Sequence, residues 1–218
     1  MEKFQRPKSL TELAAEEIRN MIIEGKLELG AALSEGKLAK RFDVSRTPIR
    51  EAFNRLETEG LVVTKPQSGT FVFKMHPAEL TKICFVRIAL ELAAIDAAFE
   101  FDPVALCEKL DAITAEMTVA HQAGRTDLYL KLDMAFHQAI FDGSNNRFLN
   151  DAYQTIAYKM AALRNRLGRN PEHMKKSFDE HQQIVEAIRA GSLTQARTIL
   201  AAHIDRKEGN YWSVTDVE

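Results

Sequence analysis

Three histidines and one aspartate in the second half of the chain have types and spacings suited to binding a metal ion. Asp133 and His137 are four residues apart, which places both side chains on one face of a helix. His181 and His203 each share a helical stripe with apolar residues, so both should point into a helix bundle. A buried imidazole or carboxylate is costly without a partner. Convergence of all four on one cation would remove that cost, and this mixture suits zinc, nickel, copper or iron.

The spacing leaves a second interpretation open. A single histidine on an apolar helix face is more often a hydrogen-bonded core residue than a metal ligand, and an Asp-x-x-x-His spacing is common. Nothing in the spacing shows that His181 and His203 meet Asp133 and His137. If they do meet, the ion would keep coordination positions for water or for the carboxylate of a ligand.

Two arginines could bind an acid beside such an ion. Arg87 lies on the same helix face as Glu91. The two could form a surface ion pair worth about 0.3 kcal/mol, or the guanidinium could point inward and grip a carboxylate through two hydrogen bonds. Arg164 is a weaker candidate, because Arg164-Asn165-Arg166 could equally form a solvated helix face.

These residues fall in a segment whose composition predicts an all-helical bundle over residues 80–218, after a short linker at 76–79. The segment has few prolines and glycines, much alanine and leucine, and no strand alternation. Breaks such as Asp102-Pro103 and Gly191-Ser192 separate the periodic stretches. The pattern predicts six helices, near 78–100, 104–123, 126–142, 146–168, 171–190 and 193–211.

A different chemistry is indicated near the N-terminus, where polar groups crowd the start of a predicted helix. Ser45 is a good N-cap, and Pro48 is tolerated in a first turn, where its missing N–H would have no partner. Arg46, Thr47 and Arg50 then project from the helix start. A recognition helix presents its N-terminal residues to the DNA major groove in this way.

The residues after this helix predict a β-hairpin with a basic tip. Leu61–Thr64 and Thr70–Phe73 have strand composition and are joined by Lys65–Gly69. Gly69 can supply the positive φ that a tight reversal requires. Helix and hairpin together indicate a wing beside a recognition helix.

Two helices upstream complete the predicted module. Ser9-Leu10-Thr11-Glu12 is a capping box and starts a helix that ends at Gly25. Ser34 can cap a short second helix before the recognition helix. Residues 1–75 are therefore predicted to form a winged helix-turn-helix, so the chain is mainly α with a small β-hairpin wing.

Composition limits the class of protein less than the motifs do. Net charge is -2, and residues 1–75 hold 13 Lys and Arg against 11 Asp and Glu, so the DNA-binding interpretation rests on the motif. No transmembrane run or signal peptide is recognised. Cys84 and Cys107 lie in apolar helical patterns, which favours buried thiols in a reducing bacterial cytoplasm over a disulfide.

The N-terminal module resembles the DNA-binding domain of GntR-superfamily transcription regulators over roughly residues 8–74. The residues that carry the resemblance are Ile23–Leu27, Gly30, Leu33–Glu35, Leu38-Ala39, Val44–Ala52, Leu56, Glu59–Leu61 and Gly69. Several family members have an arginine at the position of Gly36 that contacts phosphate. Gly36 cannot make that contact, which leaves Lys37 or Lys40 as substitutes.

The second half resembles the FCD effector domain of the FadR-type subfamily, and its six predicted helices are closer to the VanR-like branch. The residues that carry this resemblance are Arg87, Glu91, Asp133–His137, Asn146, Glu180–Ile184, Ala187-Ile188, Gly191, Ala196 and His203-Ile204. The resemblance implies that Asp133, His137, His181 and His203 are metal ligands. It also favours the inward orientation of Arg87, toward a carboxylate.

Together these features predict a DNA-binding transcription regulator, expected to be a repressor, that binds a pseudo-palindromic operator as a homodimer. A small organic acid, held at a divalent metal by Arg87 and Arg164, is the expected effector; zinc is expected first and nickel or another transition metal second. Two alternatives remain. One is a metal-dependent enzyme with an ancillary DNA-binding domain, in which Glu91 or Glu180 would be the base; the other is a pure metal sensor.

Overall fold

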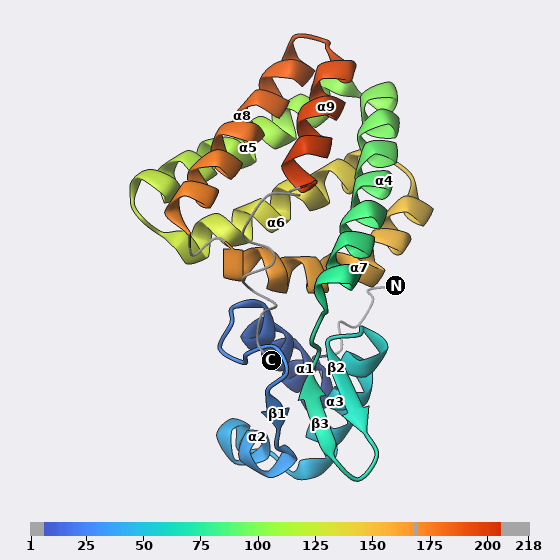
Figure 1. The fold of residues 1–218 in the computed structure, drawn as a ribbon, viewed down its shortest axis with the longest axis vertical. Helices are drawn as coiled ribbons and strands as arrows, with labels where there is room; N and C mark the ends of the chain where they lie inside the picture. The colour runs from blue at the N-terminus through green and yellow to red at the C-terminus, as the bar shows by residue number, and fades with distance from the viewer. Residues whose placement is uncertain (1–6, 168–169, 206–218) are drawn as a thin grey trace. The chain divides into compact units, whose positions relative to one another are not determined.

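The computed structural model describes residues 7–167 and 170–205 and divides into two compact units, residues 1–74 and 75–218 (Figure 1). The segment expected to be a linker, 76–79, lies mostly in the first turn of a helix that begins at Pro77. His76 and Glu79 cap that turn reciprocally, and proline is well tolerated at a first helical position. Residues 73–76 therefore separate this helix from the last strand, which ends at Val72.

The described part of the first unit, from residue 7 on, contains three helices, and their bounds follow from caps visible in the sequence. Ser9 and Glu12 form the expected capping box, and the hydroxyl of Ser34 accepts a hydrogen bond from the backbone of Lys37. Ile18, Ile49 and Leu56 are fully buried between the helices. The helices are α1 (Leu10–Ile23), α2 (Glu35–Phe42) and α3 (Arg46–Thr58).

A small antiparallel sheet completes this unit, with three strands in the order β1-β3-β2. The sequence predicted only the hairpin, whose register pairs Thr64 with Thr70. The additional strand pairs with β3 but has two residues, too few for an alternating pattern to show. The strands are β1 (Ala32–Leu33), β2 (Val62–Lys65) and β3 (Gly69–Val72).

The described part of the second unit is a bundle of six helices, which confirms the expected all-α architecture. Their bounds agree with the sequence pattern except at the end, where the last helix is described only to Ile204. The expected continuation to 211, with Tyr211 and Trp212, lies outside the described residues. The helices are α4 (Pro77–Phe101), α5 (Pro103–Gln122), α6 (Thr126–Gly143), α7 (Arg147–Leu167), α8 (Pro171–Arg189) and α9 (Leu193–Ile204).

Helix α6 packs on α4, α5 and α7, while α9 packs on α4 and α8. A continuous apolar core joins them, including Phe136, Ile140, Ile184 and Leu200. Within this core, a group of buried charged and imidazole side chains comes from α4, α6, α7, α8 and α9. The bundle therefore surrounds a polar interior.

The two cysteines and the absence of a membrane-spanning helix were the other expectations about the fold. Both cysteines are free thiols, but Cys107 is only partly buried, so the expectation of burial is correct for Cys84 alone. No described helix combines the length and the apolar character needed to span a membrane.

Candidate metal centre and DNA-binding surface

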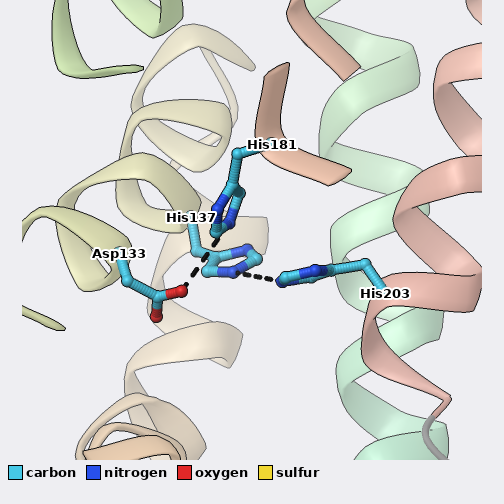
Figure 2. A group of neighbouring side chains, drawn as sticks. All are labelled: Asp133, His137, His181 and His203. Carbon is cyan, nitrogen blue, oxygen red and sulfur yellow. Dashed lines mark hydrogen bonds and ion pairs between the residues drawn. The ribbon is translucent and has the colours of Figure 1, made fainter. Parts of the chain in front are cut away.

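Asp133, His137, His181 and His203 come together in the interior of the helical unit (Figure 2). Asp133 and His137 project from the same face of α6, His181 from α8 and His203 from α9. All four are buried, and one ligand atom from each lies within 4.8 Å of the others. The packing of α6, α8 and α9 thus brings His181 and His203 next to Asp133 and His137, which the sequence spacing could not show.

The separations within the group suit ligands of one ion. Nε2 of His137 lies 3.3 Å from Nε2 of His203, and Nε2 of His181 lies 3.6 Å from Oδ1 of Asp133. Metal–nitrogen and metal–oxygen bonds of about 2.0–2.2 Å place neighbouring ligand atoms roughly 3–4 Å apart. Both pairs already have this spacing.

Two glutamates orient the imidazoles from outside the group. Nδ1 of His137 lies 2.7 Å from Oε2 of Glu91, and Nδ1 of His203 lies 2.9 Å from Oε2 of Glu180. An ionised carboxylate only accepts hydrogen bonds, so each Nδ1 carries the proton and donates it. In the neutral imidazoles the lone pairs of both Nε2 atoms then face the same point, the arrangement found when carboxylates hold metal-binding histidines.

Electrostatics keep these groups in the protonation states that a metal needs. Burial alone raises the pKa of Glu91, but the Arg87 guanidinium and His137 outweigh it and hold that pKa at about 2. Burial likewise raises the pKa of Asp133, yet the Arg164 guanidinium drives it well below its usual range. Burial also lowers the pKa of His137, which favours the neutral imidazole that can bind a cation.

Arg87 lies inside the bundle, so its ion pair with Glu91 forms in the interior and not at the surface. Its side chain is 1% exposed and its Nε donates to Oε1 of Glu91 at 2.6 Å. Its Nη2 also lies 2.9 Å from Nε2 of His137. The guanidinium therefore stands beside the nitrogen that would bind a metal.

Arg164 is inside the bundle as well, which corrects the alternative of a solvated face. It is 7% exposed, and its Nε lies 3.1 Å from Oδ2 of Asp133. Arg166, two residues on, is only partly buried and donates to the carbonyl of Ala162. The two arginines of this motif thus face different surroundings.

Sequence reasoning missed three residues of this centre. Glu91 and Glu180 were considered as possible bases and not as partners of His137 and His203. Tyr153 on α7 was not considered, although its side chain is fully buried. Its position is three helical turns before Arg164, on the same helix face, and that spacing was the available signal.

The candidate DNA-binding residues gather around the start of α3. Ser45 takes the expected N-cap position, but its side chain makes no capping hydrogen bond. Ser45, Arg46, Thr47 and Arg50 are exposed and Pro48 is partly buried. Arg50 forms a two-pronged ion pair with Glu35, with nitrogen–oxygen distances of 2.9 and 2.8 Å.

The other candidate DNA-binding residues lie on α2 and on the wing. A Cβ atom added to Gly36 would lie 3.5 Å from Nη2 of Arg46, an ordinary van der Waals contact, so this part of α2 lies beside that guanidinium. Lys37 is exposed in the first turn of α2. Gly69 begins β3 with a φ of 106°, a left-handed conformation that favours glycine.

Comparison with known proteins identifies the family. A model of the FCD domain matches residues 82–206, and a model of the gntR family of bacterial regulatory proteins matches residues 10–72. The chain is a GntR-family transcription regulator with an FCD domain. The family and the relatives below are regulators, which decides against the enzyme alternative.

Several relatives of this GntR regulator are transcription regulators. One, in an unstable DNA locus of Streptomyces ambofaciens, is 35% identical over 86% of this chain and 78% of the relative. The gluconate operon repressor of Bacillus licheniformis is 28% identical over 79% of this chain and 73% of the relative. A GntR regulator structure from Rhodococcus sp. RHA1 has the same fold, with a TM-score of 0.81, 22% identity, and coverage of 95% and 98% of the two chains.

Proposed function

We propose that this protein is a bacterial cytoplasmic repressor whose affinity for its operator is set by a small organic acid bound at a divalent metal in the FCD domain. The operator is a pseudo-palindromic duplex bound by a homodimer. Zinc is the first candidate for the metal, and nickel or another transition metal the second. The gluconate operon repressor among the relatives supports the repressor assignment.

One observation carries the metal part of this proposal. The Nε2 atoms of His137 and His203 lie 3.3 Å apart, while a glutamate occupies Nδ1 of each ring. A divalent cation near both Nε2 atoms would stabilise two lone pairs held this close in a buried site, whereas the Arg87 guanidinium lies within hydrogen-bond distance of that of His137. The residues that would hold the ion are Asp133, His137, His181 and His203.

The effector part follows from the charges beside these ligands. A bound divalent ion offers a Lewis-acidic position to a carboxylate oxygen. Arg87 and Arg164 flank the ligands His137 and Asp133, and a guanidinium can hold a carboxylate through paired hydrogen bonds. An acid bound there contacts groups from α4, α6 and α7 at once, so it can favour one arrangement of these helices over another.

For the DNA side, Ser45, Arg46, Thr47, Pro48 and Arg50 form the groove-facing helix start. Lys37 and the wing at Gly69 contact the backbone on either side. A single module offers few base contacts, so two copies on two half-sites are the physical expectation. Because ligand and operator are linked through one equilibrium, an acid that weakens operator binding must itself bind less tightly when operator is present.

The test is operator binding by full-length protein under three conditions: metal-free, zinc-loaded, and zinc-loaded with an acid from a panel of mono- and dicarboxylates. The proposal expects an acid to weaken operator binding only when zinc is present. Release of operator by zinc alone, unaffected by any acid, would show a pure metal sensor. An acid acting equally on metal-free protein would refute the proposed site.

A further inference from the structure

The charged groups buried in the helical unit balance only while no metal is bound. Among the described residues, four charged side chains are buried: Arg87, Arg164, Glu91 and Asp133. Their formal charges cancel when the histidines are neutral. A divalent ion at the candidate centre would add two positive charges to this interior, where an uncompensated charge is costly.

Glu180 is a further carboxylate at the edge of this interior. Its carboxylate faces His203 on one side, but its side chain is 13% exposed and it lies 4.0 Å from the ammonium of Lys176. Its carboxylate thus lies at the edge of the bundle, near a lysine whose side chain is 68% exposed. The four buried charged side chains do not themselves compensate the two charges of a divalent ion.

Arg164 has buried N–H donors that an anion could satisfy. All three of its side-chain nitrogens are buried and make no hydrogen bond to the described residues. Its ion pair with Asp133 brings Nε to 3.1 Å from Oδ2, outside hydrogen-bond geometry. A guanidinium has five N–H donors, and leaving buried donors unsatisfied is unfavourable. Arg87 differs, because Glu91 and His137 already contact its guanidinium.

Tyr153 offers a second donor in the same region. Its hydroxyl is buried and has no hydrogen-bond partner among the described residues. Burial raises the pKa of this hydroxyl, while the charge of Arg164 opposes that shift and the charge of Glu91 adds to it. The hydroxyl therefore stays protonated and lies within the electrostatic field of the centre.

Building on the proposed function, we propose that the effector is a dicarboxylate. One carboxylate would bind the metal and the guanidinium of Arg87, and the other would be held by Arg164 with the hydroxyl of Tyr153. Such a dianion supplies two negative charges beside the metal and the buried arginines, and it can accept hydrogen bonds from donors of Arg164 and Tyr153 that have no hydrogen-bond partner among the described residues. A monocarboxylate would supply only one charge and would leave one anchoring point unused.

The test is calorimetric titration of zinc-loaded, full-length protein with straight-chain dicarboxylates of three to six carbons, each compared with the monocarboxylate of equal length. The best dicarboxylate should bind about 10- to 100-fold more tightly than its matched monocarboxylate, the range of one hydrogen-bonded charge pair. Arg164→Gln should abolish most of this preference while zinc content stays the same. Tyr153→Phe, which removes only the hydroxyl, should weaken dicarboxylate binding roughly 2- to 10-fold.

Two substitutions on the same helix serve as controls. Tyr158→Phe and Arg166→Gln make the same chemical changes at partly buried positions that are not among the buried polar groups, and they should leave the preference intact. Equal affinity of mono- and dicarboxylates, with one zinc per chain, would overturn the dicarboxylate subsite but leave the proposed function standing.

Other outcomes separate the remaining possibilities. Loss of zinc in Arg164→Gln would show that Arg164 positions the metal ligand Asp133. In that case Tyr153→Phe decides: if this variant keeps its zinc and loses affinity for dicarboxylates alone, the subsite stands, and otherwise it is overturned. Failure of zinc-loaded protein to bind any acid would overturn both this inference and the proposed function.

Discussion

Glu180 is not among the four candidate ligands, yet its carboxylate determines which nitrogen of His203 faces them. The hydrogen bond from Nδ1 of His203, at 2.9 Å, leaves Nε2 as the only nitrogen that can bind an ion. Glu91 does the same for His137 at 2.7 Å. At the scale of single residues, the centre is thus a set of ligands whose orientation depends on a surrounding set of carboxylates.

Glu180→Gln should weaken zinc binding without unfolding the protein. The amide can present its NH2 group as well as its oxygen to His203, so the ring loses its fixed tautomer and some basicity. Loss of such an outer partner typically costs about 10- to 100-fold in metal affinity, measured here by competition with a chelator of known affinity. Glu186→Gln, an exposed position on the same helix, is the control. Equal affinity in both variants would contradict the role given to Glu180.

Arg46→Ala and Arg50→Ala should each weaken operator binding while leaving the melting temperature nearly unchanged. Loss of a base contact costs about 1–3 kcal/mol and relaxes specificity, whereas loss of a phosphate contact lowers the salt dependence. Because Arg50 forms an ion pair with Glu35, the effect of Arg50→Ala on operator binding also includes the loss of that pair, which leaves Glu35 without this partner. Arg189→Ala, in the helical unit, is the control. If the double variant bound operator with unchanged affinity and salt dependence, neither arginine would contact the DNA.

The ligand set was predictable only in part at this scale. Asp133 and His137 follow from a four-residue spacing, because one helix fixes their relation. That His181 and His203 join them depends on how α8 and α9 pack against α6, which periodicity within a helix cannot determine. The burial of Arg87 depends on the same packing, since its spacing from Glu91 fits a surface pair equally well.

At the scale of elements, the wing depends on a reversal between β2 and β3. Lys65 pairs with Gly69 across the hairpin, and Gly69 has a φ of 106°. A β-branched residue there is strained even though no atom lies within 4 Å of the added Cβ. The requirement for glycine is therefore conformational and not steric crowding by neighbours.

Gly69→Val should destabilise the first unit by about 1–3 kcal/mol through backbone strain, and should weaken operator binding because the wing tip is displaced. Chemical denaturation and a DNA-binding titration measure the two effects. Thr70→Val is the control, because it introduces the same valine side chain at the next position of β3, and it should change the free energy of unfolding little. Parental stability and affinity in Gly69→Val would show that neither the turn nor its role is as described.

The elements that were predicted well are those with local signals. The capping box at Ser9 and Glu12 and the proline at 103 mark helix starts within a few residues. Strand β1 escaped prediction because its two residues are defined only by pairing with β3. The start of α4 was placed one residue late, since the reciprocal cap of His76 and Glu79 is not among the usual serine or aspartate signals.

At the scale of the whole molecule, the proposal requires two copies of the chain on one operator. A duplex with both half-sites should bind about 100-fold or more tightly than a duplex with one, because the second module binds at high effective concentration. Sedimentation of the free protein and of both complexes measures the stoichiometry. Equal affinity for the two duplexes, with one chain bound to each, would contradict the homodimer.

The central claim is that the FCD domain binds one divalent metal through residues of α6, α8 and α9. The most direct test is the zinc content of full-length protein after equilibration with zinc and removal of unbound ion. We predict close to one zinc per chain in the parent and in His173→Ala, whose imidazole lies outside the cluster, but almost none in His137→Ala. Full zinc retention by folded His137→Ala, or a folded parent that retains none, would contradict the account.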